Sequence, residues 1–181
     1  MMQKAECITQ LARQLNSDDP KFDKLLEILK QKQNLENNKV MVFSSFRHTL
    51  AYLSGKGNAA GLRCKLVQGD TPDEERLHIR KRFSLPKSSA DAVDVVFFSE
   101  VGSEGLDYQF CDTIVNYDLP WNPMRIEQRI GRIDGVGQKS EAVAIYNMIT
   151  PGTVDADIYH RCLLRIGVFE QNIGECDAIL G

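Results

Sequence analysis

The chain has 181 residues, of which 43% are hydrophobic and 26% are charged, and its formal net charge is −3 at pH 7. This length suits one domain of ordinary size, and the apolar content excludes a wholly disordered chain. The slight negative charge excludes attraction to nucleic acid through overall charge, so a nucleic-acid role would require local basic patches.

Cysteine usage and hydropathy narrow the class of protein further. The five cysteines are odd in number, widely scattered and without a CxxC pair. This pattern fits reduced thiols better than disulfides or a zinc site, and we expect no metal ligands. No apolar run reaches the length of a membrane span, and residues 1–30 lack the pattern of a signal peptide. We therefore expect a soluble, cytoplasmic protein.

Apolar residues at helical spacing predict two helices at the start of the chain. The first covers residues 2–15. The second begins after Asp19, a suitable N-cap ahead of Pro20 at the first helical position, and the polar run 31–38 ends it. Its apolar stripe consists of Phe22, Leu25, Leu26 and Leu29.

Short apolar runs further along the chain predict five β-strands. These runs are residues 40–43, 63–67, 93–98, 113–117 and 143–149. A helix is expected from near Phe46, with Leu50 and Leu53 on its inner face. Its return loop should be marked by Gly55, Gly57 and Gly61.

The helix expected after the second strand has a clear start signal. Thr71-Pro72-Asp73-Glu74 combines a capping box with proline at the first helical position. Basic residues follow along this helix, and its apolar contacts are expected from Leu77, Ile79 and Phe83.

Short strands that alternate with helices predict an α/β fold, a doubly wound and mostly parallel sheet flanked by helices. We expect an N-terminal helical extension at 1–35, the α/β lobe at 36–152 and a C-terminal helical extension at 153–181. Sites in such sheets gather at the carboxyl ends of the strands. The turns expected to converge on that edge are 44–45, 68–71, 99–107 and 118–121.

Three arginines follow the fourth strand, in the stretch MRIEQRIGRIDGVGQ at residues 124–138. The spacing of Arg125, Arg129 and Arg132 places all three near one face of a short helix, which Asn122 would cap ahead of Pro123. Arginines grouped in this way suit a polyanion such as phosphate, because the guanidinium fork matches its oxygens. The alternative is a solvated basic face, and the stretch alone does not separate the two interpretations.

The remaining nucleotide-binding patterns are incomplete. The chain has no GxxxxGK[ST] loop, no acidic DExx run after a strand to hold magnesium, and no GxGxxG after a strand. Gly105 would admit a ribose close to the backbone and Asp107 would accept its hydroxyl hydrogens. A tight turn is the simpler explanation of Gly102 and Gly105. The chain thus carries parts that complement a nucleotide site without constituting one.

Four blocks, in order, resemble the second RecA-like lobe (the helicase C-terminal domain) of Swi/Snf-like superfamily-2 helicases, from about Phe22 onward. KVMVFSSF resembles motif IV, LVQGDTPDEER the block after it, SEVGSEGLDYQ motif V, and DLPWNPMRIEQRIGRIDGVGQ the segment that ends in motif VI. The QRIGR core and the tail GVFEQNIGECDAIL lean towards the bacterial type associated with RNA polymerase.

This resemblance implies the C-terminal motor lobe of an ATP-dependent nucleic-acid translocase. The lobe would be inactive without an N-terminal RecA-like lobe, which shares the ATP and supplies Mg²⁺. The expected substrate is double-stranded DNA, with RNA polymerase or another protein–DNA complex as a further partner and a nucleoid location in a bacterium. The isolated chain is expected to lack ATPase activity.

The same resemblance implies roles for individual residues. Gln128 and Arg132 match positions that face the nucleotide phosphates, with Arg132 as an arginine finger, and Arg129 matches a position that couples the two lobes. Gly105 and Asp107 match motif V positions near the nucleotide. The blocks that line the nucleic-acid track contain Ser44, Phe46, Gly69, Thr71 and Ser99.

One position departs from the family pattern QRxGRxxRxGQ, which places a second arginine finger where this chain has Gly135. Either the ATPase is crippled or repurposed, or another arginine substitutes, of which Arg125 is the nearest in sequence. The alternative function is a non-catalytic docking or regulatory module derived from such a lobe. A Rossmann-type enzyme is disfavoured because a glycine fingerprint is missing. Trp121 is expected to be a packing anchor under the arginine helix, with a stacking role as the alternative.

Overall fold

The structure is a computed structural model that describes residues 18–122, 124–153 and 156. The first predicted helix, residues 2–15, and nearly all of the C-terminal extension from residue 153 lie outside this range. Within the described range, no helix has the length and apolar character needed to cross a membrane.

The core of the molecule is a single five-stranded parallel sheet with the strand order β2-β3-β1-β4-β5. All five predicted strands are present, each within its predicted range. Every residue of β1, β3 and β4 is buried, because helices or loops cover both faces of the sheet. β1 and β3 are continuous apolar runs, whereas β4 also buries the polar residues Thr113 and Asn116. The strands are β1 (Val40–Phe43), β2 (Cys64–Val67), β3 (Val95–Phe98), β4 (Thr113–Asn116) and β5 (Ala144–Asn147).

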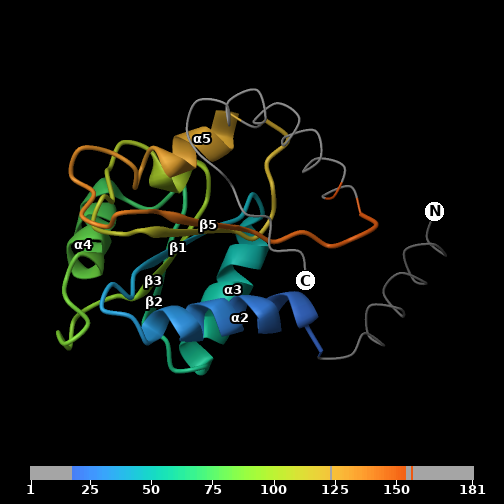
Figure 1. The fold of residues 1–181 in the computed structure, drawn as a ribbon, viewed down its shortest axis with the longest axis horizontal. Helices are drawn as coiled ribbons and strands as arrows, with labels where there is room; N and C mark the ends of the chain where they lie inside the picture. The colour runs from blue at the N-terminus through green and yellow to red at the C-terminus, as the bar shows by residue number, and fades with distance from the viewer. Residues whose placement is uncertain (1–17, 123, 154–155, 157–181) are drawn as a thin grey trace.

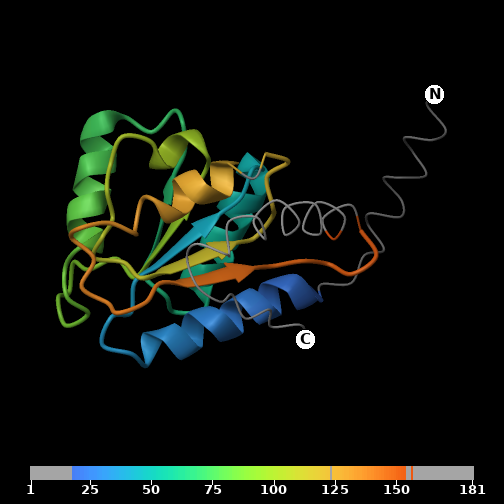
Figure 2. The same cartoon turned by 45° about the horizontal axis from the view of Figure 1, so that its top comes forward.

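Helices lie on both sides of the sheet (Figures 1 and 2), which confirms the doubly wound arrangement. α2 (Pro20–Gln33) and α3 (Arg47–Ala59) pack on one face, and α4 (Asp73–Phe83) packs on the other. α5 (Met124–Ile130) lies on the same side as α4 in both views. The buried helical side chains are Phe22, Leu25, Leu29, Leu50 and Leu53 on the first face and Ile79 and Phe83 on the second.

The start of α2 is as predicted. Asp19 is the N-cap, its Oδ1 accepts a hydrogen bond from the Phe22 N–H at 2.9 Å, and Pro20 is the first helical residue. The apolar stripe of α2 shares a core cluster with Val40 and Val42 of β1. The boundary at residue 35 between extension and lobe stays a prediction.

The prediction that Gly55 and Gly57 mark a return loop is wrong, because both lie inside α3. Gly57 is a glycine for a packing reason, since a Cβ there would lie 2.7 Å from Cys64 Sγ on β2. The chain turns only after Ala59, at Gly61, whose φ of 85° favours glycine.

The predicted capping box at Thr71 is also wrong. α4 begins at Asp73, its N-cap is Pro72, and this N-cap accepts no side-chain hydrogen bond. Thr71 Oγ1 instead accepts a hydrogen bond from the Gln68 N–H at 2.9 Å, so the hydroxyl closes the turn between β2 and α4. Leu77 is exposed and does not supply the expected apolar contact.

Candidate functional site

The turns that leave the carboxyl ends of the strands contact one another, as the parallel topology predicts. The Ser44 hydroxyl, after β1, donates a hydrogen bond to the Asp118 carboxylate, after β4. Asp118 also accepts a hydrogen bond from the Ser45 N–H at 2.8 Å. Arg47, at the start of α3, donates to Gln68 Oε1 in the turn after β2 at 3.1 Å.

The turn after β3 forms the short 3₁₀ helix η1 (Val101–Ser103). A Cβ on Gly102 would overlap the carbonyl oxygen of Val67, so only glycine fits there. Gly105 has a φ of 81°, in the left-handed region that favours glycine. Gly102 is required by its close approach to Val67, and Gly105 is favoured by its backbone conformation. A tight turn therefore explains both glycines.

The arginine helix α5 begins as predicted. Asn122 Oδ1 accepts a hydrogen bond from the Met124 N–H at 3.1 Å, and its carbonyl accepts one from the Arg125 N–H at 3.0 Å. Pro123 lies outside the described residues. The helix ends at Ile130, and a tighter turn carries the chain on to Arg132, whose N–H donates to the Arg129 carbonyl at 3.1 Å.

Arg129 is a buried arginine, with only 2% of its surface exposed. One end of its guanidinium group pairs with the Glu100 carboxylate, and Nη1 donates to Asn116 Oδ1 at 2.6 Å. The group also lies 4.9 Å from the centre of the Phe43 ring. These contacts neutralise the buried charge and fasten α5 to the ends of β1, β3 and β4.

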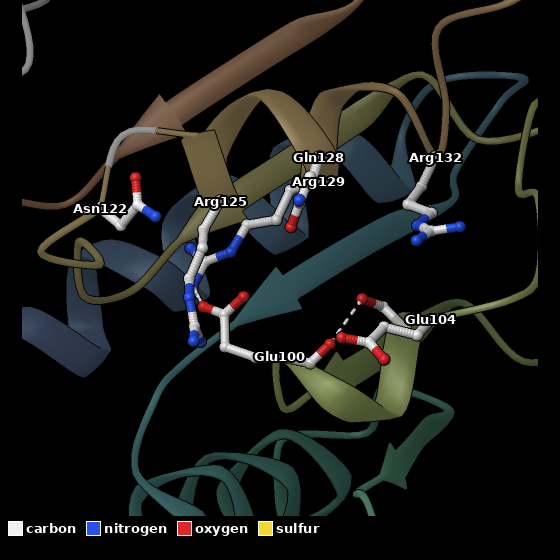
Figure 3. A pocket seen from close by; sticks show the side chains of 8 residues that line it. Glu100, Glu104, Asn122, Arg125, Gln128, Arg129 and Arg132 are labelled. Atoms are coloured by element: carbon white, nitrogen blue, oxygen red, sulfur yellow. Dashed lines mark hydrogen bonds and ion pairs between the residues drawn. The ribbon is translucent and has the colours of Figure 1, made fainter.

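An open pocket of about 250 Å³ lies between α5 and η1 (Figure 3). The three arginines of the sequence cluster all line it, although only Arg125 and Arg129 lie on α5 and Arg132 follows the end of the helix. They differ in state: Arg129 is paired and buried, whereas the guanidinium groups of Arg125 and Arg132 make no hydrogen bond or ion pair with another described residue. The lining residues are Asn122, Arg125, Gln128, Arg129 and Arg132 on one side and Glu100, Ser103 and Glu104 on the other.

Backbone contacts hold Arg132 at the edge of this pocket. Its carbonyl accepts a hydrogen bond from the Tyr108 N–H at 2.7 Å. Tyr108 is itself buried, and burial raises the pKa of its phenol to about 12 against the opposing effect of nearby arginines. Its ring packs against Phe98 and Phe110 and so supports the loop from below.

The predicted site residues do not all meet in the pocket. Gln128, Arg129 and Arg132 line it, whereas Gly105 and Asp107 do not. Asp107 is exposed, and its carbonyl accepts a hydrogen bond from Arg80 Nε at 2.7 Å.

The five residues predicted to line a nucleic-acid track occupy turns at the same edge of the sheet, in different states. Phe46 is 64% exposed, whereas Ser44 is fully buried. Ser99 Oγ accepts a hydrogen bond from the Gly102 N–H at 3.2 Å. Gly69 lies against Val101 of η1, and Thr71 closes its turn as described above.

Sequence reasoning missed the acidic side of the pocket. Glu100 directly follows the strand-end residue Ser99, so its position at the carboxyl edge was the available signal. The expectation that Trp121 anchors α5 is wrong, because its side chain is 76% exposed. Leu119 packs against Ile126, on the buried side of α5, instead.

A family model described as the helicase conserved C-terminal domain matches residues 20–135 of the chain. Among curated proteins, an uncharacterized ATP-dependent helicase, YqhH of Bacillus subtilis, is 38% identical over 80% of this chain and 25% of its own length. The RNA polymerase-associated protein RapA of Photobacterium profundum is 34% identical over 84% of this chain and 15% of its own length. The mouse DNA repair and recombination protein RAD54B is 32% identical over 80% of this chain and 16% of its own length. The chain thus spans a quarter or less of these relatives.

Solved structures share the same sheet and helix arrangement. The C-terminal part of the Fun30 ATPase domain superposes with a TM-score of 0.69 at 22% identity, over 88% of this chain and 52% of that one. The Hef helicase domain of Pyrococcus furiosus superposes with a TM-score of 0.64 at 30% identity, over 88% of this chain and 32% of that one. The RecA-like fold that the sequence motifs implied is therefore confirmed.

Proposed function

This chain belongs to the helicase conserved C-terminal domain family, in the Swi/Snf-like branch of the superfamily-2 helicases, and from that membership we propose that it is the second motor lobe of an ATP-dependent nucleic-acid translocase. The observation that carries this proposal is the Arg132 guanidinium group, which lines a pocket at the strand ends and has no partner among the described residues. A free arginine in that place is suited to stabilise the charge on a phosphoryl group as it transfers.

Neighbouring side chains support Arg132 in distinct ways. Gln128 is exposed on the same wall of the pocket and offers an amide to the phosphates. Arg129 is paired with Glu100 and so sets the position of α5. A movement of the turns at the strand ends would therefore move α5, and Arg132 with it. Gly105 and Asp107 stand outside the pocket, on the loop that meets the ribose in our proposal.

The lining of the pocket fits a polyphosphate better than a metal ion, because it holds only two carboxylates, and one of them, Glu100, pairs with Arg129. Guanidinium and amide groups bind phosphate oxygens, whereas Mg²⁺ needs oxygen ligands. In the part of the chain that the structure describes, no three His, Cys, Asp or Glu residues are grouped to hold a metal ion. We therefore assign the Mg²⁺ to an N-terminal RecA-like lobe. ATP bound between the lobes supplies the γ-phosphoryl group that is hydrolysed.

The nucleic-acid track in this proposal runs over the turns at the carboxyl edge. Phe46 and the turn that holds Gly69 and Thr71 are accessible there, while the buried Ser44 shapes its turn through Asp118. Contacts of this kind go to the phosphate backbone and carry no sequence information. We propose double-stranded DNA as the substrate, RNA polymerase as a further partner by similarity to RapA, and a cytoplasmic, nucleoid-associated location.

The test is an Arg132→Gln substitution in a protein that carries both lobes. We expect nucleic-acid-stimulated ATP hydrolysis to fall by about 10³-fold, the lower end of the range for arginine fingers. Arg82→Gln is the matched control, since Arg82 lies on α4 and donates to the Asp91 carbonyl outside the pocket. Unchanged turnover in Arg132→Gln, or turnover by this chain alone, would contradict the proposal.

Gly135 favours one alternative function. The motif VI pattern has an arginine there, and a lobe without it would suit a non-catalytic docking or regulatory module. The same two-lobe protein separates the alternatives, because a docking module would bind its partner with no ATP turnover at any nucleic-acid concentration.

A further inference from the structure

Two guanidinium groups of the pocket are left to bind an anion. Arg125 and Arg132 lie at opposite ends of its arginine-bearing wall, with Gln128 between them (Figure 3). Neither arginine forms a hydrogen bond or ion pair through its side chain with any described residue. They are seven positions apart, which corresponds to about 10 Å along a helix.

Arg125 and Arg132 differ from Arg129 in that no carboxylate of the pocket pairs with them. The Glu100 carboxylate pairs with Arg129, so that ion pair contributes no net charge. Glu104 on the opposite wall is exposed and makes no ion pair with a described residue. The positive ends of the pocket are therefore Arg125 and Arg132, and an anion long enough to span the wall would meet one at each end.

Position 135 offers no such group. Gly135 does not line the pocket, and a Cβ on it would overlap the amide of Gln109, whose side chain fills the space beside the turn. The second positive charge of the motif VI pattern is thus absent from its usual place, while Arg125, in the first turn of α5, lines the pocket with a free guanidinium group.

The fold also holds Arg125 in place. It stands in the first turn of α5, where its N–H donates to the Asn122 carbonyl at 3.0 Å. One helical turn later, Arg129 is fastened to Glu100 and Asn116. The base of Arg125 is therefore fixed, and its guanidinium group is free to move to a ligand.

We propose that Arg125 supplies the second positive charge on the polyphosphate of the bound nucleotide, in place of the side chain that Gly135 lacks. This inference rests on the proposed function of the lobe. In it Arg132 acts at the phosphoryl group that transfers, and Arg125 binds the polyphosphate from the opposite end of the pocket wall.

The test uses a protein that carries both lobes, with ATP as the ligand and single substitutions at Arg125. We expect Arg125→Gln to lower kcat/KM for ATP about tenfold and Arg125→Lys to retain part of it, because lysine keeps the charge but lacks the guanidinium fork. Arg82→Gln is again the control. Arg125 is exposed and unpaired, so the thermal midpoint of Arg125→Gln should equal that of the wild type.

Different outcomes overturn the inference and the function on which it rests. If Arg132→Gln abolishes turnover and Arg125→Gln leaves kcat/KM unchanged, Arg125 has no role and the proposed function stands. If neither substitution changes turnover, the proposed function itself fails. A double variant guards against indirect effects. Arg125→Gln combined with Gly135→Arg should regain part of the kcat/KM that Arg125→Gln alone loses. A further loss of kcat/KM would contradict the proposal that Arg125 takes the place of an arginine at position 135.

Discussion

Among the three arginines of residues 124–138, burial separates Arg129, a structural residue, from Arg125 and Arg132, which bind the nucleotide in our proposal. Arg129 resembles Arg125 and Arg132 in sequence, yet its charge is enclosed by Glu100, Asn116 and the ring of Phe43. A buried ion pair adds little net stability, but removing one partner leaves the other charge without compensation.

Replacing Glu100 should therefore destabilise the lobe. We expect Glu100→Ala to lower the free energy of unfolding by about 3 kcal/mol, because it leaves the Arg129 guanidinium group buried and unpaired. Glu104→Ala is the matched control at the other end of η1, where the carboxylate is exposed and a change of less than about 0.5 kcal/mol is expected. Urea unfolding of both variants checks the prediction, and equal midpoints would disprove it.

Restoring an arginine at position 135 should speed ATP hydrolysis. We expect Gly135→Arg to raise nucleic-acid-stimulated turnover of a two-lobe protein about threefold, a change of about 0.7 kcal/mol in the barrier, because Arg125 already supplies part of the missing charge. The Gln109 side chain must move to admit the new residue, and its amide end is flexible. Gly135→Ala requires the same movement without adding charge, so it should bring no gain. A gain in both variants would attribute the effect to Gln109 and not to the charge.

At the scale of elements, helix α3 shows how contacts from another strand overrule a local signal. Glycine usually weakens a helix, so the local sequence predicts a loop at Gly55 and Gly57. The helix nevertheless continues through both. Only Gly57 faces the sheet, where Cys64 leaves no room for a larger residue, while the space around Gly55 is open.

The two glycines of α3 should respond to alanine with opposite signs. Gly55→Ala should raise the free energy of unfolding by about 0.5–1 kcal/mol through helix propensity alone. Gly57→Ala should lower it by about 1 kcal/mol, since the new methyl group meets Cys64 Sγ at 2.7 Å and overpacking outweighs propensity. Thermal melts of both variants provide the comparison. Stabilisation by Gly57→Ala would show that Cys64 yields without cost.

At the scale of the whole molecule, the parallel sheet determines where the site lies. All five strands run in one direction, so the turns after them meet at one edge even though they are far apart in the chain. The ion pair between Arg129 and Glu100 joins residues 29 positions apart. At the opposite, amino edge of the sheet, burial leaves the thiol of Cys111 in an apolar cluster, where it contacts the carbonyl oxygens of Lys39 and Thr113.

The buried thiol of Cys111 should make the fold sensitive to alkali. Burial raises its pKa from 9.0 to about 12, so the unfolded chain loses this proton first as pH rises. The stabilisation is fully present below pH 9 and is lost as the pH rises towards 12, by about 1 kcal/mol between pH 8 and pH 10. Urea unfolding at both pH values should show a smaller loss in Cys111→Ala than in the wild type. An identical loss would exclude the thiol as a cause.

The sequence by itself was sufficient for features that depend on neighbours along the chain. Five apolar runs predicted five strands, Asp19-Pro20 predicted the start of α2, and the order of motifs predicted the RecA-like lobe and its family. These signals are local or are carried by spacing, so they can be read without coordinates.

Only the tertiary structure determined which residues are free to act. Three arginines with the same local pattern became one buried and two free groups because Glu100 and Asn116 reach Arg129 from other strands. The burial of Ser44, whose hydroxyl donates to Asp118, likewise depends on a partner distant in sequence. Whether a side chain is buried and paired or exposed and free depends on the residues that pack against it. In this fold those residues come together only when the sheet forms and the turns after its strands meet at one edge.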